Sequence, residues 1–321
     1  MSAVNTATSE HVAITEGAGL VDRSERGKLA LTGADAKEFL AGQVTNDVVG
    51  LEPGDGCYAA MLTPKGRMLG DLRVLDTGDE LLLDMDREAL QAIFDVIRRA
   101  TIGFAVELHK RTLQRGLLSL AGPRARAIAG ATDLPVTEHA HRVVTIGGAE
   151  VRGIATDVGV DVLTLAEDTD AVRDALLAAG AEPVSEATLD VLRVETGRPR
   201  WGAELDETVI PQEAGLNDRA VSFTKGCYVG QETVARLHWK GKPNRHLRGL
   251  QLSEPVPVGA ALFLGEREVG RLTSVVDSPA HGPVGLALVR REAGVGEVLR
   301  VGDGDVTATV AELPFGLPPA A

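Results

Sequence analysis

The sequence predicts an α+β fold built from two related halves. Short apolar strand patterns alternate with amphipathic helix patterns along residues 28–195. The pattern of residues 29–40, LALTGADAKEFL, returns at 117–128, LLSLAGPRARAI, and residues 81–94 resemble 162–177 in the same way. Chance similarity between alanine- and leucine-rich elements is the competing explanation. At 321 residues the chain also exceeds the usual size of a single core, so we expect more than one domain.

The first half begins after residues 1–18, which we expect to be a disordered N-terminus. A DTGD turn separates two apolar runs and predicts a strand pair. Beyond this pair, Ile93, Phe94 and Ile97 recur at helical spacing, and Asp86 is placed to cap that helix. We therefore expect strands at 28–31, 57–62, 67–75 and 80–85, and helices at 34–40 and 87–99.

Residues 193–216 carry the densest run of unusual residues in the chain. They follow a predicted helix at 186–195 and hold two prolines and few strand-forming residues. Trp201 offers an apolar anchor, so we expect an ordered loop of the kind that carries function. Glu195 ends the helix, where the macrodipole disfavours a carboxylate, so another group should hold it. An exposed surface glutamate is the alternative.

The chain is acidic, with a formal net charge of -13. This charge argues against a broad nucleic-acid surface, because affinity for phosphate backbones comes from Lys and Arg. No run approaches the roughly 18 apolar residues of a membrane span, and the N-terminus lacks the pattern of a secretory signal. The two cysteines, Cys57 and Cys227, lie 170 positions apart without a metal-binding spacing. These features predict a cytoplasmic protein with no resident metal and no disulfide framework.

One segment reverses this acidity. Between Thr233 and Ser253 there is no acidic residue, and its cations could receive a carboxylate or a phosphate. A solvated linker between domains is the alternative, which the turn chemistry of WKGKPNR supports. The basic residues of the segment are Arg236, His238, Lys240, Lys242, Arg245, His246 and Arg248.

Residues 225–232, KGCYVGQE, carry the most chemistry. Two glycines suit a shaped loop, and residues 231–239 suit a short helix. Cys227 would then lie just before a helix start and two residues after the cation of Lys225, and both influences favour a thiolate. Such a thiol could be a nucleophile, a metal ligand or a redox sensor. A free cysteine packed as a small hydrophobe is the alternative.

These stretches resemble a known family. ETGRPRWGAELDETVIPQEAGL is similar to the corresponding run of the glycine-cleavage T-protein, the tetrahydrofolate-dependent aminomethyltransferase. KGCYVGQE resembles the signature that separates YgfZ-type folate-binding proteins from true T-proteins, which lack the cysteine. RGKLALTGADAKEFLAGQVTND is similar to the family's N-terminal block, TPKGRMLGDLRV to its folate-contacting turn, and VGRLTSVVDSPAHGPVGLALV to its C-terminal barrel. The resemblance covers nearly the whole chain.

The resemblance implies a three-domain ring with folate in a central channel. Residues 19–245 would form a folate-binding region of two interleaved α+β domains, with a boundary near 104–116, and residues 246–321 a β-barrel. The implied cofactor is tetrahydrofolate or a one-carbon-substituted folate. Glu195 would accept hydrogen bonds from the pterin N–H groups, and the basic segment could meet the glutamate tail. The implied folate-binding residues are Glu195, Trp201, Lys225, Gly226, Tyr228, Gly230, Gln231, Glu232 and Arg236.

The resemblance also implies a role for the thiol. The YgfZ-type group supports iron-sulfur cluster assembly or repair, and through it iron-sulfur enzymes such as those that thiolate tRNA. Cys227 would be the working thiol, and iron-sulfur assembly proteins or client enzymes would be its partners. One thiolate cannot hold a cluster alone, so Cys227 would serve as a transient ligand that a partner completes.

Two other functions stay open. The chain could be a tetrahydrofolate-dependent aminomethyltransferase or another one-carbon enzyme that uses Asp71 as its acid/base group. T-proteins carry two adjacent acids where this chain has Gly70 and Asp71, which argues against the transfer if the catalytic acid belongs at position 70. Alternatively, the chain is a binding module for another anionic small molecule, and its cysteine is structural.

Overall fold

The computed structural model describes the backbone of residues 3–316 and the side chains of residues 9–316. The chain forms two compact units. Segments 64–68, 189–218 and 230–245, which the sequence places before the barrel domain, group with the barrel in the second unit. The first unit comprises Met1–Thr63, Leu69–Thr188 and Arg219–Val229, and the second Pro64–Met68, Leu189–Asp218 and Gly230–Ala321.

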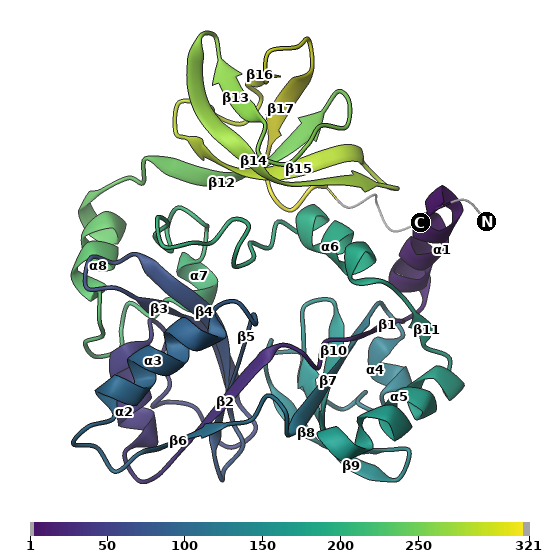
Figure 1. Cartoon of the computed structure of the whole chain (residues 1–321), viewed down its shortest axis with the longest axis vertical. Coiled ribbons are helices and arrows are strands. Elements are labelled where there is room, and N and C mark those ends of the chain that lie inside the picture. Colours follow the sequence, from purple (N-terminus) through teal and green to yellow (C-terminus); the bar gives the residue numbers. More distant parts are fainter. Residues whose placement is uncertain (1–2, 317–321) are drawn as a thin grey trace. The chain divides into compact units, whose positions relative to one another are not determined.

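The first half of the first unit is a five-stranded sheet in the order β3-β4-β5-β2-β6, and Figure 1 shows α3 lying across this sheet. The helix predicted at 87–99 begins only at Leu90, and Asp86 does not cap it. The carboxylate of Asp86 instead forms an ion pair with Arg26, 2.5 Å away, so it is directed to a partner distant in sequence. The elements are β2 (Gly27–Thr32), α2 (Ala36–Gln43), β3 (Gly56–Leu62), β4 (Met68–Asp76), β5 (Leu81–Met85), α3 (Leu90–Ala100) and β6 (Glu107–Lys110).

The second half is a six-stranded sheet in the order β11-β1-β7-β10-β9-β8. Its strand β1 comes from the N-terminus and pairs antiparallel with β7, so the two halves are interleaved. The elements β7 and α4 repeat the order of β2 and α2, and β10 and α5 repeat that of β5 and α3, which confirms the predicted relation between the halves. The bounds are β1 (Gly19–Asp22), β7 (Arg115–Ala121), α4 (Ala125–Ile128), β8 (His141–Ile146), β9 (Ala149–Ala155), β10 (Gly159–Leu165), η1 (Ala166–Asp168), α5 (Thr169–Ala178) and β11 (Glu182–Pro183).

The N-terminal segment is helical, which corrects the prediction of disorder for residues 1–18. Helix α1 spans Ala3–Glu16, while residues 1 and 2 lie outside the described part. Ile14 is buried in this helix. The carboxylate of Glu10 accepts hydrogen bonds from the hydroxyl groups of Ser185 and Thr188. These contacts lie far away in the sequence, so local composition did not predict the helix.

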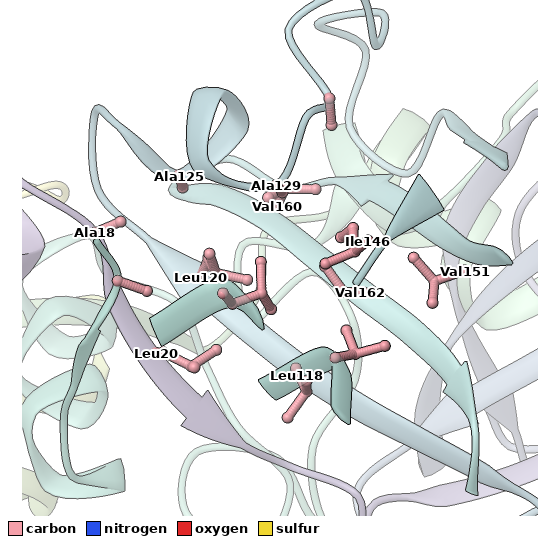
Figure 2. Packing of buried hydrophobic residues seen from close by; sticks show 14 of the residues in the cluster. Ala18, Leu20, Leu118, Leu120, Ala125, Ala129, Ile146, Val151, Val160 and Val162 are labelled. Carbon is pink, nitrogen blue, oxygen red and sulfur yellow. The ribbon is translucent and has the colours of Figure 1, made fainter. Parts of the chain in front are cut away.

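The core of the first unit is aliphatic, as the low aromatic content requires. Figure 2 shows alternate residues of neighbouring strands, such as Leu118, Leu120, Val160 and Val162, packed into one cluster. Fully burying such a side chain contributes roughly 1.5–3 kcal/mol to folding. A smaller cluster joins the two sheets to each other, and it consists of Ala30, Leu75, Leu82, Leu117, Ile154 and Leu163.

The second unit contains a closed six-stranded barrel in the order β12-β15-β14-β13-β16-β17. Together with the two α/β halves, this barrel confirms the predicted fold class. The loop after α6 is ordered, because Leu205, Val209 and Leu216 are buried. In the described residues, no helix is long and apolar enough to cross a membrane. The remaining elements are α6 (Glu186–Glu195), α7 (Asn217–Ala220), α8 (Gln231–Lys240), β12 (Arg245–Leu252), β13 (Ala261–Leu264), β14 (Arg267–Ser278), β15 (Gly282–Arg290), β16 (Val298–Val301) and β17 (Thr307–Ala311).

Candidate functional site

The predicted site residues divide between the two units. The contacts of each group therefore lie within one unit. Asp71, Lys225, Gly226, Cys227 and Tyr228 belong to the first unit, and Glu195, Trp201, Gly230, Gln231, Glu232 and Arg236 to the second.

The loop that carries the cysteine is held by Lys225. The Lys225 ammonium group donates hydrogen bonds to the carbonyl groups of Ala41 and Val44, the latter at 2.7 Å. These carbonyls belong to the C-terminal turn and the C-cap of α2, where backbone acceptors lack helical partners and a cation is favourable. The same ammonium lies 4.9 Å from the ring centroid of Tyr228, which is buried. Lys225 thus anchors the loop on both sides of Cys227.

The two thiols have different surroundings. Cys227 is exposed, whereas Cys57 on β3 is half-buried. Burial, and to a smaller extent the carboxylate of Asp47, raises the pKa of Cys57 to about 12. Burial also lowers the pKa of Lys225 to about 8. The nearby acidic groups that oppose this lowering are Asp47 and, more weakly, Cys57. The thiolate character predicted for Cys227 stays a prediction.

The second glycine of the motif begins the following helix. Gly230 is the N-cap of α8 and has a φ of 85°, a conformation that glycine adopts without strain. Gly226 is exposed and does not need a positive φ. In α8, Val234 is buried and His238 is exposed, so His238 does not share the buried face that its spacing suggests.

Asp71 forms a half-buried hydrogen-bonded pair with Tyr58. The Tyr58 hydroxyl donates to Oδ2 of Asp71 at 2.8 Å, while Oδ1 is inaccessible to solvent and has no hydrogen-bond partner in the described residues. Burial, followed by the nearby Asp86, raises the pKa of Asp71 to about 6. A carboxyl group with this pKa can exchange a proton near neutral pH.

Gly70 leaves no room for the second acid of the T-protein pattern. A Cβ atom at this position would lie 2.7 Å from Cδ1 of Ile93 and 3.1 Å from Cβ of Ala89. Helix α3 therefore packs directly against the strand at Gly70. Because successive side chains of a strand point to opposite faces, Asp71 faces away from that helix.

Two further residues that the sequence did not single out, Arg219 and His139, lie against Tyr58. The guanidinium group of Arg219 lies 5.2 Å from the Tyr58 ring centroid and donates to Glu138 at 2.5 Å. The ring of His139 lies 6.4 Å from that of Tyr58, and His139 has a φ of 72°. Burial, with the nearby Arg73 and Arg219, lowers the pKa of His139 to about 3. These residues come from distant segments, so no local motif could have identified them.

In the second unit, Glu195 is buried at the end of α6. The hydroxyl group of Ser278 donates to its Oε1 at 2.5 Å. The sequence required another group to hold this carboxylate, and Ser278 provides it. Trp201 is half-buried and forms an isolated bridge with Leu205, and Arg236 is exposed on α8. Gln231 and Glu232 form the first turn of α8, where a carboxylate is favourable.

The basic segment does not act as one patch. Arg245 forms a bidentate ion pair with Glu213, at 3.1 Å from Nε to Oε1 and 2.8 Å from Nη2 to Oε2. Lys240 and Lys242 are exposed. Among the described residues, no group of three or more His, Cys, Asp and Glu side chains could hold a metal ion.

Comparison with known proteins extends over most of the chain. The family description "GCVT N-terminal domain" matches residues 2–225, and "Glycine cleavage T-protein C-terminal barrel domain" matches residues 245–315. A chloroplastic protein of Arabidopsis thaliana named "Putative transferase" is 31% identical in an alignment of 318 residues that covers 94% of this chain and 72% of the relative. An aminomethyltransferase of Geobacillus thermodenitrificans is 30% identical over 327 residues, covering 95% of this chain and 89% of the relative.

A solved structure agrees with these matches. The crystal structure of the glycine cleavage system aminomethyltransferase T from Bartonella henselae superposes with a TM-score of 0.86 at 26% identity. The superposition covers 97% of this chain and 89% of the Bartonella protein. The similarity therefore includes both α/β halves and the barrel.

Proposed function

Because this chain belongs to the glycine cleavage T-protein family, we propose that it binds a folate and supports iron-sulfur cluster assembly or repair through Cys227. The folate part is supported by the match of both family domains over most of the chain. Tetrahydrofolate or a one-carbon-substituted form is the proposed ligand, and Glu195 is the residue proposed to bind its pterin ring. When bound, a tetrahydrofolate would supply one-carbon or reducing chemistry.

The observation that carries the role of the thiol is the exposure of Cys227 on an anchored loop. Lys225 ties this loop to the end of α2, so the thiol is presented to solvent at a defined place. One thiolate supplies one ligand of the four that a cluster normally needs. We therefore propose that an iron-sulfur assembly protein or client enzyme supplies the others. Iron-sulfur enzymes that thiolate tRNA are among the proposed clients.

Cells that carry only a Cys227→Ser protein test this role. We expect their iron-sulfur enzyme activities to fall to the level of cells that lack the protein. Cys57→Ser is the matched control, because it removes the half-buried thiol and leaves Cys227 in place. Normal activity with Cys227→Ser, in a background where deletion impairs the enzymes, would remove the thiol from the proposal. Normal activity after deletion would remove the iron-sulfur role itself.

A second candidate function is a tetrahydrofolate-dependent aminomethyl transfer. Two observations favour it: two of the similar proteins carry the name aminomethyltransferase, and Asp71 has a pKa of about 6. Asp71 would be the acid/base group, and Tyr58 would orient it through their hydrogen bond. Turnover of an aminomethyl-lipoyl carrier protein with tetrahydrofolate tests this activity. A rate in the wild type that is lost in Asp71→Asn would favour the enzyme over the accessory role.

A further inference from the structure

A cavity with a volume of 840 Å³ lies entirely within the second unit. Its walls are the loop 203–213, the side chain of Arg67 and residues of the barrel strands β12, β14 and β15. This volume falls in the range of about 300–1,000 Å³ that is typical of small-molecule sites. The charges on its walls decide which ligand it could take.

Two arginines at the cavity are balanced by two acids. Arg245 forms the bidentate pair with the buried carboxylate of Glu213, and Arg67 lies 4.0 Å from the same carboxylate. Asp206, which also lines the cavity, favours the charged form of Arg245 and so raises its pKa further. This half of the cavity is therefore close to neutral.

The other charged groups, except one, have their own partners. Arg271 forms an ion pair with Glu268 at 2.8 Å. Glu204 is buried and forms an ion pair with Arg193 at 2.8 Å, behind the cavity wall. The exception is Arg290, an exposed residue at the cavity that has no ion pair within 4.0 Å among the described residues.

The position of Arg290 makes this charge unusual. In the barrel, Arg290 on β15 lies directly opposite Arg245 on β12, so both side chains leave the sheet on the same face. Like charges in directly opposed positions are destabilising. Glu292 follows two residues later and forms its close ion pair with Arg267 at 3.0 Å, while Arg290 attracts this carboxylate only from a longer distance. Arg290 is thus the guanidinium group of the cavity that has no close carboxylate partner among the described residues.

We propose that this cavity binds a small molecule through a carboxylate group held by Arg290. The pair of Arg245 and Glu213 shows that this face of the barrel accommodates a carboxylate against a guanidinium group. A planar guanidinium matches a carboxylate through two parallel hydrogen bonds. A doubly charged phosphate fits less well, because the acids Glu213 and Asp206 line the same cavity.

Two sources could supply the carboxylate. One is a free small carboxylic acid such as an amino acid, and the other is the glutamate tail of a folate. The second source rests on the proposed function, whereas the carboxylate site itself does not. If the tail is the source, Arg290 is the cation that meets it, and this residue lies outside the basic segment at 236–248.

Calorimetric titration with p-aminobenzoyl-L-glutamate, the tail of folate without its pterin, tests the site. We expect wild-type protein to bind it and Arg290→Gln to bind at least about tenfold more weakly, because a charge-assisted hydrogen-bonded pair is lost. Arg291→Gln is the matched control, since the neighbouring arginine is exposed, makes the same charge change and does not line the cavity. Equal affinity of Arg290→Gln and wild type, or no binding by wild type at millimolar concentration, would overturn the proposal.

A second titration identifies the source. Tetrahydrofolate is compared with tetrahydropteroate, which lacks the glutamate, in wild type and Arg290→Gln. If the glutamate strengthens binding only in the wild type, the tail occupies the cavity. The other outcome is that the glutamate strengthens folate binding equally in both proteins, although Arg290→Gln no longer binds p-aminobenzoyl-L-glutamate or L-glutamate. In that case the ligand of the cavity is a free small carboxylic acid. Binding of L-glutamate through Arg290 without any binding of folate would keep this site and contradict the proposed function.

Discussion

At the scale of single residues, the two cysteines differ in the solvent exposure of their thiols. Cys227 is exposed on a loop, and Cys57 is half-buried with a pKa raised to about 12. The thiolate is the reactive form of cysteine, so its fraction and its access set the rate of modification. The two sites should therefore differ in a way that a chemical probe can measure.

We expect Cys227 to react with a maleimide probe at least about tenfold faster than Cys57 in the folded protein near pH 7.5. Mass spectrometry of quenched time points gives the rate at each site. The unfolded protein is the control, because there the two thiols should react at similar rates. Equal rates in the folded protein, or faster labelling of Cys57, would contradict the role given to Cys227.

Asp71 leads to a prediction about pH. Its pKa is raised to about 6 in the folded protein, above the unfolded value, so folding favours the protonated form. As pH rises through this range the ionised carboxylate costs stability, and asparagine avoids that cost. We expect Asp71→Asn to gain on the order of 2 kcal/mol relative to wild type between pH 4 and pH 8, measured by chemical denaturation at both values.

The exposed acid Asp170 provides the control for this prediction. Asp170→Asn should change the free energy of unfolding by a similar small amount at both pH values, because surface charges contribute little. If Asp71→Asn followed the same course as Asp170→Asn, the surroundings of Asp71 would not raise the pKa of its carboxyl group.

At the scale of elements, the difference between predicted and observed structure follows from the range of the contacts. The helix at 186–195 and the strand at 57–62 were predicted within a residue, since periodicity and turn residues are local signals. The start of α3 was placed too early because Asp86 binds Arg26, a residue 60 positions away. Helix α1 was missed for the same reason, since its Glu10 is held by Ser185 and Thr188.

Lys225 shows how one side chain can hold a functional element. Its ammonium group donates hydrogen bonds to two carbonyls at the end of α2 and lies against the ring of Tyr228. We expect Lys225→Met to lower the free energy of unfolding by about 1–2 kcal/mol, because two backbone acceptors lose a charged donor. It should also increase hydrogen exchange of the amides at 225–229, which report on the order of the loop.

Lys242→Met is the matched control for the anchor, because Lys242 is exposed and makes the same change of side chain. Its effect should stay within about 0.5 kcal/mol. An equal effect of the two substitutions would show that the loop does not depend on Lys225 for its conformation.

At the scale of the whole molecule, the fold was predictable where the chain repeats itself. The repeated strand-glycine-helix pattern predicted two related halves, and the structure contains one sheet for each half. The sequence singled out candidate site residues only within contiguous motifs, such as Cys227 and Glu195, and their roles stay predictions. The cluster around Tyr58 joins Asp71, His139 and Arg219 from separate segments, and no spacing in the sequence connects them.

Folate binding should be measurable as an effect on the stability of the whole protein. A molecule that binds only the native protein raises the free energy of unfolding by RT ln(1 + c/Kd), where c is its free concentration, and so raises the melting temperature. We expect tetrahydrofolate to raise the melting temperature of the wild type, and Glu195→Gln to reduce that shift strongly, because an amide cannot accept two hydrogen bonds from the pterin N–H groups as a carboxylate does. Glutamine keeps an acceptor for the Ser278 hydroxyl, so the variant should still fold.

The exposed Glu182→Gln serves as the control and should retain the full shift. If the wild type shows no shift at millimolar tetrahydrofolate, folate binding is excluded; if Glu195→Gln keeps the full shift, the pterin is bound by another residue.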